Sequence, residues 1–199
     1  YIIMMRQYNV CITNPPYMGS KGMSDKLKKY LEENYINSKA DLCTVFMELV
    51  KIYVKKYGFL SMINQHTWMF LSSFDKLRED LINNNSFINM LHLGTRAFQE
   101  ISGEVVQSTA FIIRNNMIKK YLGTYVDLKS FNNSEEKQKY AIKSIENSVP
   151  YKYFCSIELF EAIPNSPIAY WVNNKIIKIF DNKLFFEYSI SDGKNVTGN

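Results

Sequence analysis

The 199-residue chain has few cysteines, no metal-ligand spacing and no long apolar run. Its three cysteines, Cys11, Cys43 and Cys155, lie far apart in apolar stretches, which favours buried thiols in a reducing cytoplasm over a disulfide framework. His66 and His92 are not spaced from the cysteines as metal ligands would be. No segment has the length and composition of a signal peptide or a membrane span. We therefore expect a cytoplasmic protein with no metal site and no membrane contact.

The chain also has little excess charge and little glycine. Its 24 Lys and Arg residues against 19 Asp and Glu residues give a net charge of +5, which is compatible with nucleic-acid binding and equally with an ordinary soluble protein. A hydrophobic content of 46% excludes a disordered chain and permits a sizeable core. The first residue is Tyr1 rather than methionine, and a predicted strand follows almost at once. We therefore expect a fragment that begins inside a fold.

The most informative stretch is Asn14-Pro15-Pro16-Tyr17, which directly follows the apolar run 8–13. Alternating apolar residues in that run predict a buried strand. The two prolines end the strand rigidly, because proline lacks an N–H group and fixes φ. In open α/β sheets, ligands bind at the carboxyl ends of the strands. The motif is therefore predicted to lie at a functional edge.

The groups of this motif suit methyl transfer to an exocyclic amine. If the Asn14 side-chain oxygen and the Pro15 carbonyl accept the two amine hydrogens, the nitrogen lone pair becomes available to attack an electrophilic methyl group. Tyr17 would supply a flat surface for a base drawn out of a duplex. The alternative is that the motif is only a Pro-Pro turn after a strand.

The rest of the pattern predicts alternating helices and strands. Ser24 caps a helix to about Asn34, whose lysine face meets either phosphates or solvent. Ser38 and Asp41 form a capping box for a second helix that runs to about Tyr57, with Gly58 as its C-terminal stop. The later segments are a strand at 59–64, a helix that begins at 72–75, strands at 87–93 and 105–114, an exposed strand at 121–131, a charged helix at 134–147 and a helix from 166 to about 181.

The motif resembles the catalytic motif of amino-group DNA methyltransferases that use S-adenosylmethionine. The order of elements over 8–115 is similar to the second half of the γ-type, TaqI-like, N6-adenine methyltransferase domain. This resemblance implies transfer of a methyl group from S-adenosylmethionine to N6 of a flipped adenine in double-stranded DNA, with Asn14, Pro15, Pro16 and Tyr17 as the catalytic residues.

The resemblance extends to residues beyond the motif. Residues 41–48 resemble the next family motif, which implies that Asp41 and Phe46 bind the cofactor. Phe98 matches the phenylalanine that contacts the flipped base. Residues 64–68 resemble a strand end at which the family usually has a proline before a Thr-Trp pair, and Gln65-His66 stand in its place.

Two longer stretches, 68–78 and 163–172, resemble the adenine-specific methyltransferases of BREX phage-exclusion systems, and type IIG restriction–methylation enzymes share the first stretch. This resemblance implies a role in phage defence or restriction–modification, with other defence-system proteins as partners. Two alternatives remain. One is methylation of RNA or protein by the same motif, and the other is a catalytically silent DNA-binding or scaffold part of a defence complex.

The sequence thus predicts an α/β fold: the C-terminal half of a Rossmann-like methyltransferase sheet, followed by a mixed α+β connector. We expect a partial catalytic domain over 1–115, and the connector with the start of a target-recognition domain over 116–199. The glycine loop with which the family binds its cofactor does not occur in this sequence. We therefore expect the fragment to be inactive alone, and its uncovered edge strand to favour self-association.

Overall fold

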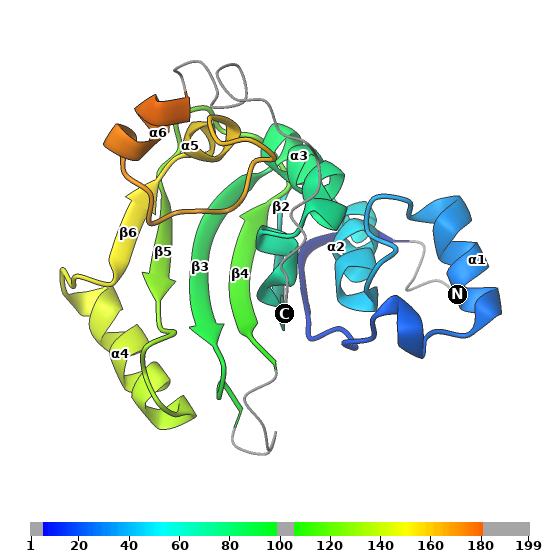
Figure 1. The fold of residues 1–199 in the computed structure, drawn as a ribbon, viewed down its shortest axis with the longest axis horizontal. Helices are drawn as coiled ribbons and strands as arrows, with labels where there is room; N and C mark the ends of the chain where they lie inside the picture. Colours follow the sequence, from blue (N-terminus) through cyan, green and yellow to red (C-terminus); the bar gives the residue numbers. More distant parts are fainter. Residues whose placement is uncertain (1–5, 99–105, 181–199) are drawn as a thin grey trace, which may run out of the picture.

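A computed structural model describes residues 6–98 and 106–180. Its centre is a six-stranded sheet in the order β1-β2-β4-β3-β5-β6 (Figure 1). Strands β1, β2, β3 and β5 run in one direction, and β4 and β6 run in the other. The strands are β1 (Tyr8–Thr13), β2 (Val54–Gln65), β3 (Ser86–Gly94), β4 (Ser108–Arg114), β5 (Gly123–Asp127) and β6 (Lys152–Cys155).

The helices lie around this sheet. Figure 1 shows α1 and α2 beside the β1 side and α4 on the opposite side. None of the helices in the described ranges has the length and apolar character needed to cross a bilayer. The helices are α1 (Asp25–Asn34), α2 (Leu42–Tyr53), α3 (Asp75–Asn84), α4 (Ser134–Glu146), α5 (Ile157–Glu161) and α6 (Asn174–Phe180).

The predicted order of strand, helix, strand, helix, strand, loop and strand is confirmed. Strands β1 and β2 pair in parallel and are joined through α2, which makes one crossover unit. The predicted helix cap at Ser24 is also confirmed, because its side-chain oxygen accepts a hydrogen bond of 3.3 Å from the Leu27 N–H.

The prediction that β1 is buried is wrong. Among the described residues β1 pairs only with β2, so it forms an edge of the sheet. Val10 is 52% exposed and Ile12 is 77% exposed. The alternating pattern correctly indicated a strand, but it could not show whether the second face and the outer edge would be covered.

The predicted boundaries of the second helix are also wrong. Asp41, rather than Ser38, is the N-cap of α2, and the helix ends at Tyr53. The chain continues directly into β2, where the Asn115 side chain donates a hydrogen bond of 2.9 Å to the Val54 carbonyl. Gly58 is not the helix stop. It lies in β2 where a Cβ atom would come within 2.6 Å of the Asn9 carbonyl oxygen, so the two strands approach closely there.

The strand predicted over 121–131 is shorter and is not exposed. Strand β5 lies inside the sheet between β3 and β6, and Tyr125 and Val126 are buried. The prediction failed because β6 was not recognised as a strand. Its four residues are too few to show a clear alternation.

The helix predicted from Ser166 begins only at Asn174. Asn165 and Ser166 both have positive φ angles, of 63° and 46°, which end any helical path. Residues 165–171, which we call the strap, instead cross in front of β3 towards β5 (Figure 1), where the ring of Tyr170 stacks on that of Tyr125. Within the strap, the Ile168 N–H donates to the Met69 carbonyl. The predicted end of this helix at Asp181 and the predicted start of a recognition domain at 191–199 lie outside the described residues.

The strap is joined to the loop after β2 by the fully buried side chain of Arg78 on α3. Its guanidinium donates to the carbonyls of Trp68 at 2.8 Å and Leu71 at 2.7 Å, in the loop after β2. It also donates to the carbonyls of Asn165 at 2.9 Å and Ser166 at 3.2 Å. One planar group therefore holds α3, the loop after β2 and the strap together.

We expect Arg78→Met to lower the unfolding free energy by about 3 kcal/mol or more, because the buried carbonyls would lose their donors. Chemical denaturation of the chain measures this loss. Lys76→Met on the exposed side of the same helix is the control, and its expected effect is within about 0.5 kcal/mol. Equal losses for the two variants would contradict the assigned role of Arg78.

We expect the uncovered edge of β1 to promote self-association of the chain, and Ile12→Lys to reduce it, because a lysine on an edge strand opposes edge-to-edge pairing. Light scattering over a range of concentrations tests this. Ile145→Lys is a matched control, because Ile145 on α4 is 79% exposed and lies away from β1. A clean monomer for the unmodified chain would contradict the expectation.

Candidate active site

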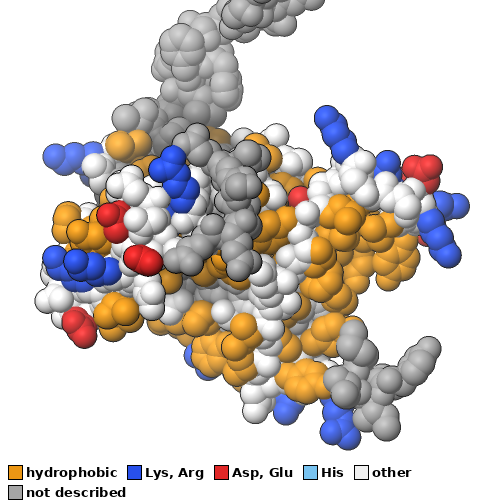
Figure 2. Space-filling model, turned by 90° about the horizontal axis from the view of Figure 1, so that it is seen from below, with side chains coloured by type: hydrophobic (Ala, Val, Ile, Leu, Met, Phe, Trp, Pro, Cys, Tyr) orange, Lys and Arg blue, Asp and Glu red, His pale blue; other side chains and the backbone are white. Residues whose placement is uncertain are grey.

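The candidate site lies at the edge of the sheet where the parallel strands end. Asn14 follows β1, His66 follows β2, Gly94 ends β3 and Lys129 comes soon after β5. Because these four strands run in the same direction, all four positions share one edge. Figure 2 views the molecule from this side, with hydrophobic side chains gathered between charged side chains at the periphery.

The four residues of the turn after β1 differ in their exposure to solvent. Asn14 and Pro16 are exposed, Pro15 is buried and Tyr17 is half-buried. The buried proline fixes the turn from inside, since its ring is packed and its φ angle is restricted. The Asn14 amide is consequently presented to solvent from a rigid backbone.

Asp41 fixes the segment that follows this turn. Its Oδ1 atom accepts hydrogen bonds from the Met18 N–H at 3.3 Å and from the Cys43 N–H at 2.9 Å. The Leu42 N–H also donates to the Met18 carbonyl at 3.0 Å. One carboxylate oxygen therefore caps α2 and holds the loop against it. The predicted contact of Asp41 with a cofactor stays a prediction.

Tyr17 has a buried hydroxyl end and a half-exposed ring. The hydroxyl is buried beside the Ser108 hydroxyl of β4, and neither has a hydrogen-bond partner among the described residues. Burial, reinforced by the neighbouring Cys43 thiol, raises the pKa of Tyr17. Tyr17 is therefore a neutral phenol, with its hydroxyl held inside and its ring half-exposed.

The two predicted aromatic residues come from other elements. Phe46 lies one turn beyond the start of α2, is half-buried and packs against the main core. Phe98 is half-buried in a bend shortly after β3, at the same edge as Tyr17. The structure thus brings Asp41 into contact with Met18, the residue that follows the Asn14–Tyr17 turn, and it places Phe46 and Phe98 on other elements.

Ser108 is a site residue that the sequence did not indicate. It lies at the start of β4, pairs with Gln65 of β2 and is fully buried. A serine at the end of an apolar strand has no distinctive pattern, so only the pairing of β4 with β2 reveals its place near Tyr17. Within the described ranges, no three His, Cys, Asp or Glu side chains gather as a metal site.

Comparison with known proteins identifies relatives of the chain. Residues 3–98 match the family described as Eco57I restriction-modification methylase. The chain is 45% identical over 174 residues to adenine-specific methyltransferase PglX of Lacticaseibacillus casei (strain Zhang), which covers 87% of the chain. It is 40% identical over 178 residues to adenine-specific methyltransferase BrxX of Escherichia coli O9:H4 (strain HS), which covers 89% of the chain. The resemblance indicated by the sequence motifs is confirmed.

These relatives are much longer proteins, because the chain spans 14% of the length of each. Among solved structures, the methyltransferase subunit of a type I restriction-modification system from Streptococcus thermophilus is similar, with a TM-score of 0.58 and 16% identity. That match covers 82% of this chain and 37% of the subunit. The likeness confirms an α/β methyltransferase fold.

We expect Asp41→Ala to lower the unfolding free energy by about 1 kcal/mol and Asp41→Asn to lower it less, because asparagine keeps a capping oxygen. Hydrogen exchange at the Met18 amide should rise in Asp41→Ala only. Ser24→Ala, which removes the cap of α1, is the control: it should cost similar stability and leave Met18 exchange unchanged. Unchanged Met18 exchange in Asp41→Ala would contradict the role assigned to Asp41.

Proposed function

Because residues 3–98 belong to the family of Eco57I restriction-modification methylases, we propose that this chain carries the catalytic turn of a DNA methyltransferase acting on N6 of adenine. One observation carries the proposal: Asn14 is presented at the carboxyl edge of the sheet, on a turn that Pro15 fixes from inside, and Asp41 holds Met18, the residue that follows this turn. Such preorganised acceptors suit an amine that becomes positively charged as it reacts.

In the proposed mechanism, the adenine leaves the duplex and stacks on the half-exposed ring of Tyr17. The Asn14 side-chain oxygen and the Pro15 carbonyl accept hydrogen bonds from its amino group, which directs the nitrogen lone pair outwards. Phe98 contacts the other side of the base. When bound, S-adenosylmethionine would supply the electrophilic methyl group: its S–CH3 bond would break as the N6–CH3 bond forms, S-adenosylhomocysteine would leave, and N6 would then lose one proton to solvent. The acceptors stabilise the charge that develops on N6, so a strong base is not required.

The residues present fit part of a site for S-adenosylmethionine. The half-buried ring of Phe46 offers an apolar surface to an adenine ring. Asp41 keeps a second carboxylate oxygen, Oδ2, which would lie 3.7 Å from a Cβ atom built on Gly19 and thus near the loop after Tyr17. The rest of the cofactor site would come from other parts of a longer protein, as the length of the relatives suggests.

We further propose that β1 to β4 form the C-terminal half of the methyltransferase sheet. Residues 1–115 would then belong to the catalytic domain, and residues 116–199 would form the connector and the start of a target-recognition domain. The substrate would be double-stranded DNA, and the biological role would be phage defence or restriction–modification together with other defence proteins. A silent scaffold, or an enzyme that methylates RNA or protein, is the competing function.

In the full-length protein, we expect Asn14→Ala to lower the rate of methyl transfer to adenine by about a hundredfold or more, because one preorganised acceptor is lost. The assay uses labelled S-adenosylmethionine and unmethylated duplex DNA. The same assay compares the full-length protein with the 199-residue chain, which we expect to be inactive alone. Asn9→Ala, at the exposed start of the same strand, is the matched control and should retain activity. Full activity in Asn14→Ala would contradict the role assigned to Asn14, whereas no methylation by the unmodified full-length protein would favour the silent-scaffold alternative.

A further inference from the structure

Two histidines and a tyrosine form a hydrogen-bonded chain next to the candidate site. The His66 Nδ1 atom lies 2.7 Å from the His92 Nε2 atom, and the His92 Nδ1 atom lies 2.9 Å from the Tyr170 hydroxyl. His92 and Tyr170 are buried, whereas His66 is half-buried. This hydrogen-bonded series thus leads from Tyr170 in the strap, through His92 in β3, to His66, the residue that follows β2.

The side chains of His66, His92 and Tyr170 are all neutral near pH 7. Burial, together with the charge of Lys129, lowers the pKa of His66, and the same causes lower that of His92 to about 3. Each of the two contacts needs one proton. A phenol is a stronger donor than a neutral imidazole, so Tyr170 donates to His92 and His92 donates to His66. The remaining proton of His66 then lies on Nε2, which makes that nitrogen a donor.

His66 is close to the turn that carries Asn14. Its backbone N–H donates to the Gln107 carbonyl at 2.8 Å, and the next residue, Ser108, lies beside the Tyr17 hydroxyl. His66 therefore lies on the β2 side of Tyr17.

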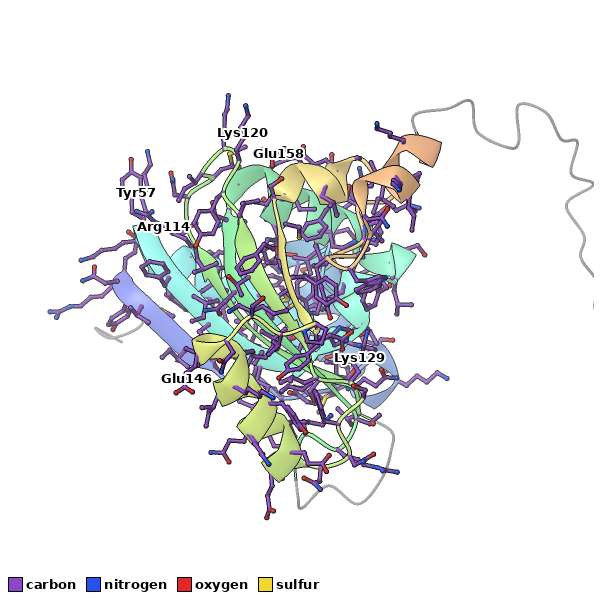
Figure 3. All side chains as sticks on the ribbon, turned by 90° about the vertical axis from the view of Figure 1, so that its left-hand side faces the viewer. Tyr57, Arg114, Lys120, Lys129, Glu146 and Glu158 are labelled. Atoms are coloured by element: carbon purple, nitrogen blue, oxygen red, sulfur yellow. The ribbon has the colours of Figure 1, made fainter. Side chains whose placement is uncertain are left out.

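Lys129 adds an ammonium group at this place, which is paired with the Asp127 carboxylate at a distance of 3.2 Å. Gly94 packs against it, since a Cβ atom built there would lie 3.0 Å from the Lys129 Cγ atom. Figure 3 shows Lys129 at the opposite end of the sheet from Tyr57 and Arg114. Its ammonium lies 4.7 Å from the ring centre of Trp171, which is 40% exposed. A donor N–H, a cation and an exposed aromatic ring together suit the anionic backbone of a nucleic acid.

We propose that His66 is a further substrate-contacting residue, whose Nε2–H group donates to a phosphate oxygen of the DNA next to the flipped adenine. His92 and Tyr170 are positioning residues that fix the ring and its tautomer. This inference rests on the proposed function. It assigns a role to a histidine that stands where the family usually has a proline.

The test uses the full-length protein and a duplex oligonucleotide that contains its own methylation site. We expect His66→Leu to raise the Kd for this DNA about tenfold, because a hydrogen bond to a charged group is lost. His66→Gln keeps a donor and should stay within about threefold of the unmodified protein. A Kd for His66→Leu equal to that of the unmodified protein would overturn the proposal.

A chemical change in the DNA identifies the contact itself. Each phosphate next to the target adenine is replaced in turn by an uncharged methylphosphonate. At one position the unmodified protein should bind about tenfold more weakly, whereas His66→Leu should show no further loss, because the two changes remove the same contact. Equal losses in both proteins at every position would exclude the phosphate contact.

The positioning residues have their own matched pair of variants. Tyr170→Phe removes the hydroxyl that ends the chain and should reduce the methylphosphonate effect several-fold. Tyr153→Phe, whose ring lies 5.5 Å from that of Tyr170, should leave the effect unchanged. An unchanged effect in Tyr170→Phe would show that Tyr170 and His92 do not position His66.

If the unmodified protein fails to methylate adenine at all, the proposed function itself is wrong. If the unmodified protein methylates adenine and the His66 variants bind DNA as tightly as it does, this inference alone fails.

Discussion

The buried guanidinium of Arg78 is the interaction on which the arrangement of the other parts depends. It donates to four backbone carbonyls, two in the loop after β2 and two at the start of the strap. A buried charge of this kind is tolerated only when it is paired or hydrogen-bonded. The two strap carbonyls belong to Asn165 and Ser166, whose positive φ angles form the turn that directs both groups to Arg78. Backbone strain in the strap is thus offset by strong hydrogen bonds.

The candidate site is held from two sides by such contacts. On the β1 side, the Asp41 carboxylate connects the loop after Tyr17 to α2. On the β2 side, Arg78 fixes the loop that begins at His66, and Tyr170 of the strap reaches the same loop through His92. Both sides are fixed by groups that lie outside the Asn14–Tyr17 turn itself. Catalysis by preorganised acceptors requires this kind of support, since misplaced acceptors lose their advantage.

Local signals in the sequence predicted most of the elements correctly. Ser24 and the alternating residues of β1 and β2 act through short-range geometry, so their helix and strands could be recognised from neighbouring residues alone. The errors concern features that depend on distant residues. The early end of α2 depends on β2 and Asn115, and the extended strap depends on Arg78, which lies 87 residues before Asn165. The histidine chain could not be predicted either, because Tyr170 and His92 are 78 residues apart.

The pairing of the strands in the sheet affects how firmly the candidate site is held. Strands β2, β4, β3 and β5 are paired on both sides, whereas β1, which leads into the Asn14–Tyr17 turn, is paired on one side among the described residues. An edge strand opens more easily than a central one, because fewer hydrogen bonds and contacts must be broken. The position of Asn14 therefore depends strongly on Asp41 and on the pairing with β2. Any further strand that covered Val10 and Ile12 would stabilise the turn as well as the sheet, which couples the assembly of the fold to the placement of the acceptors.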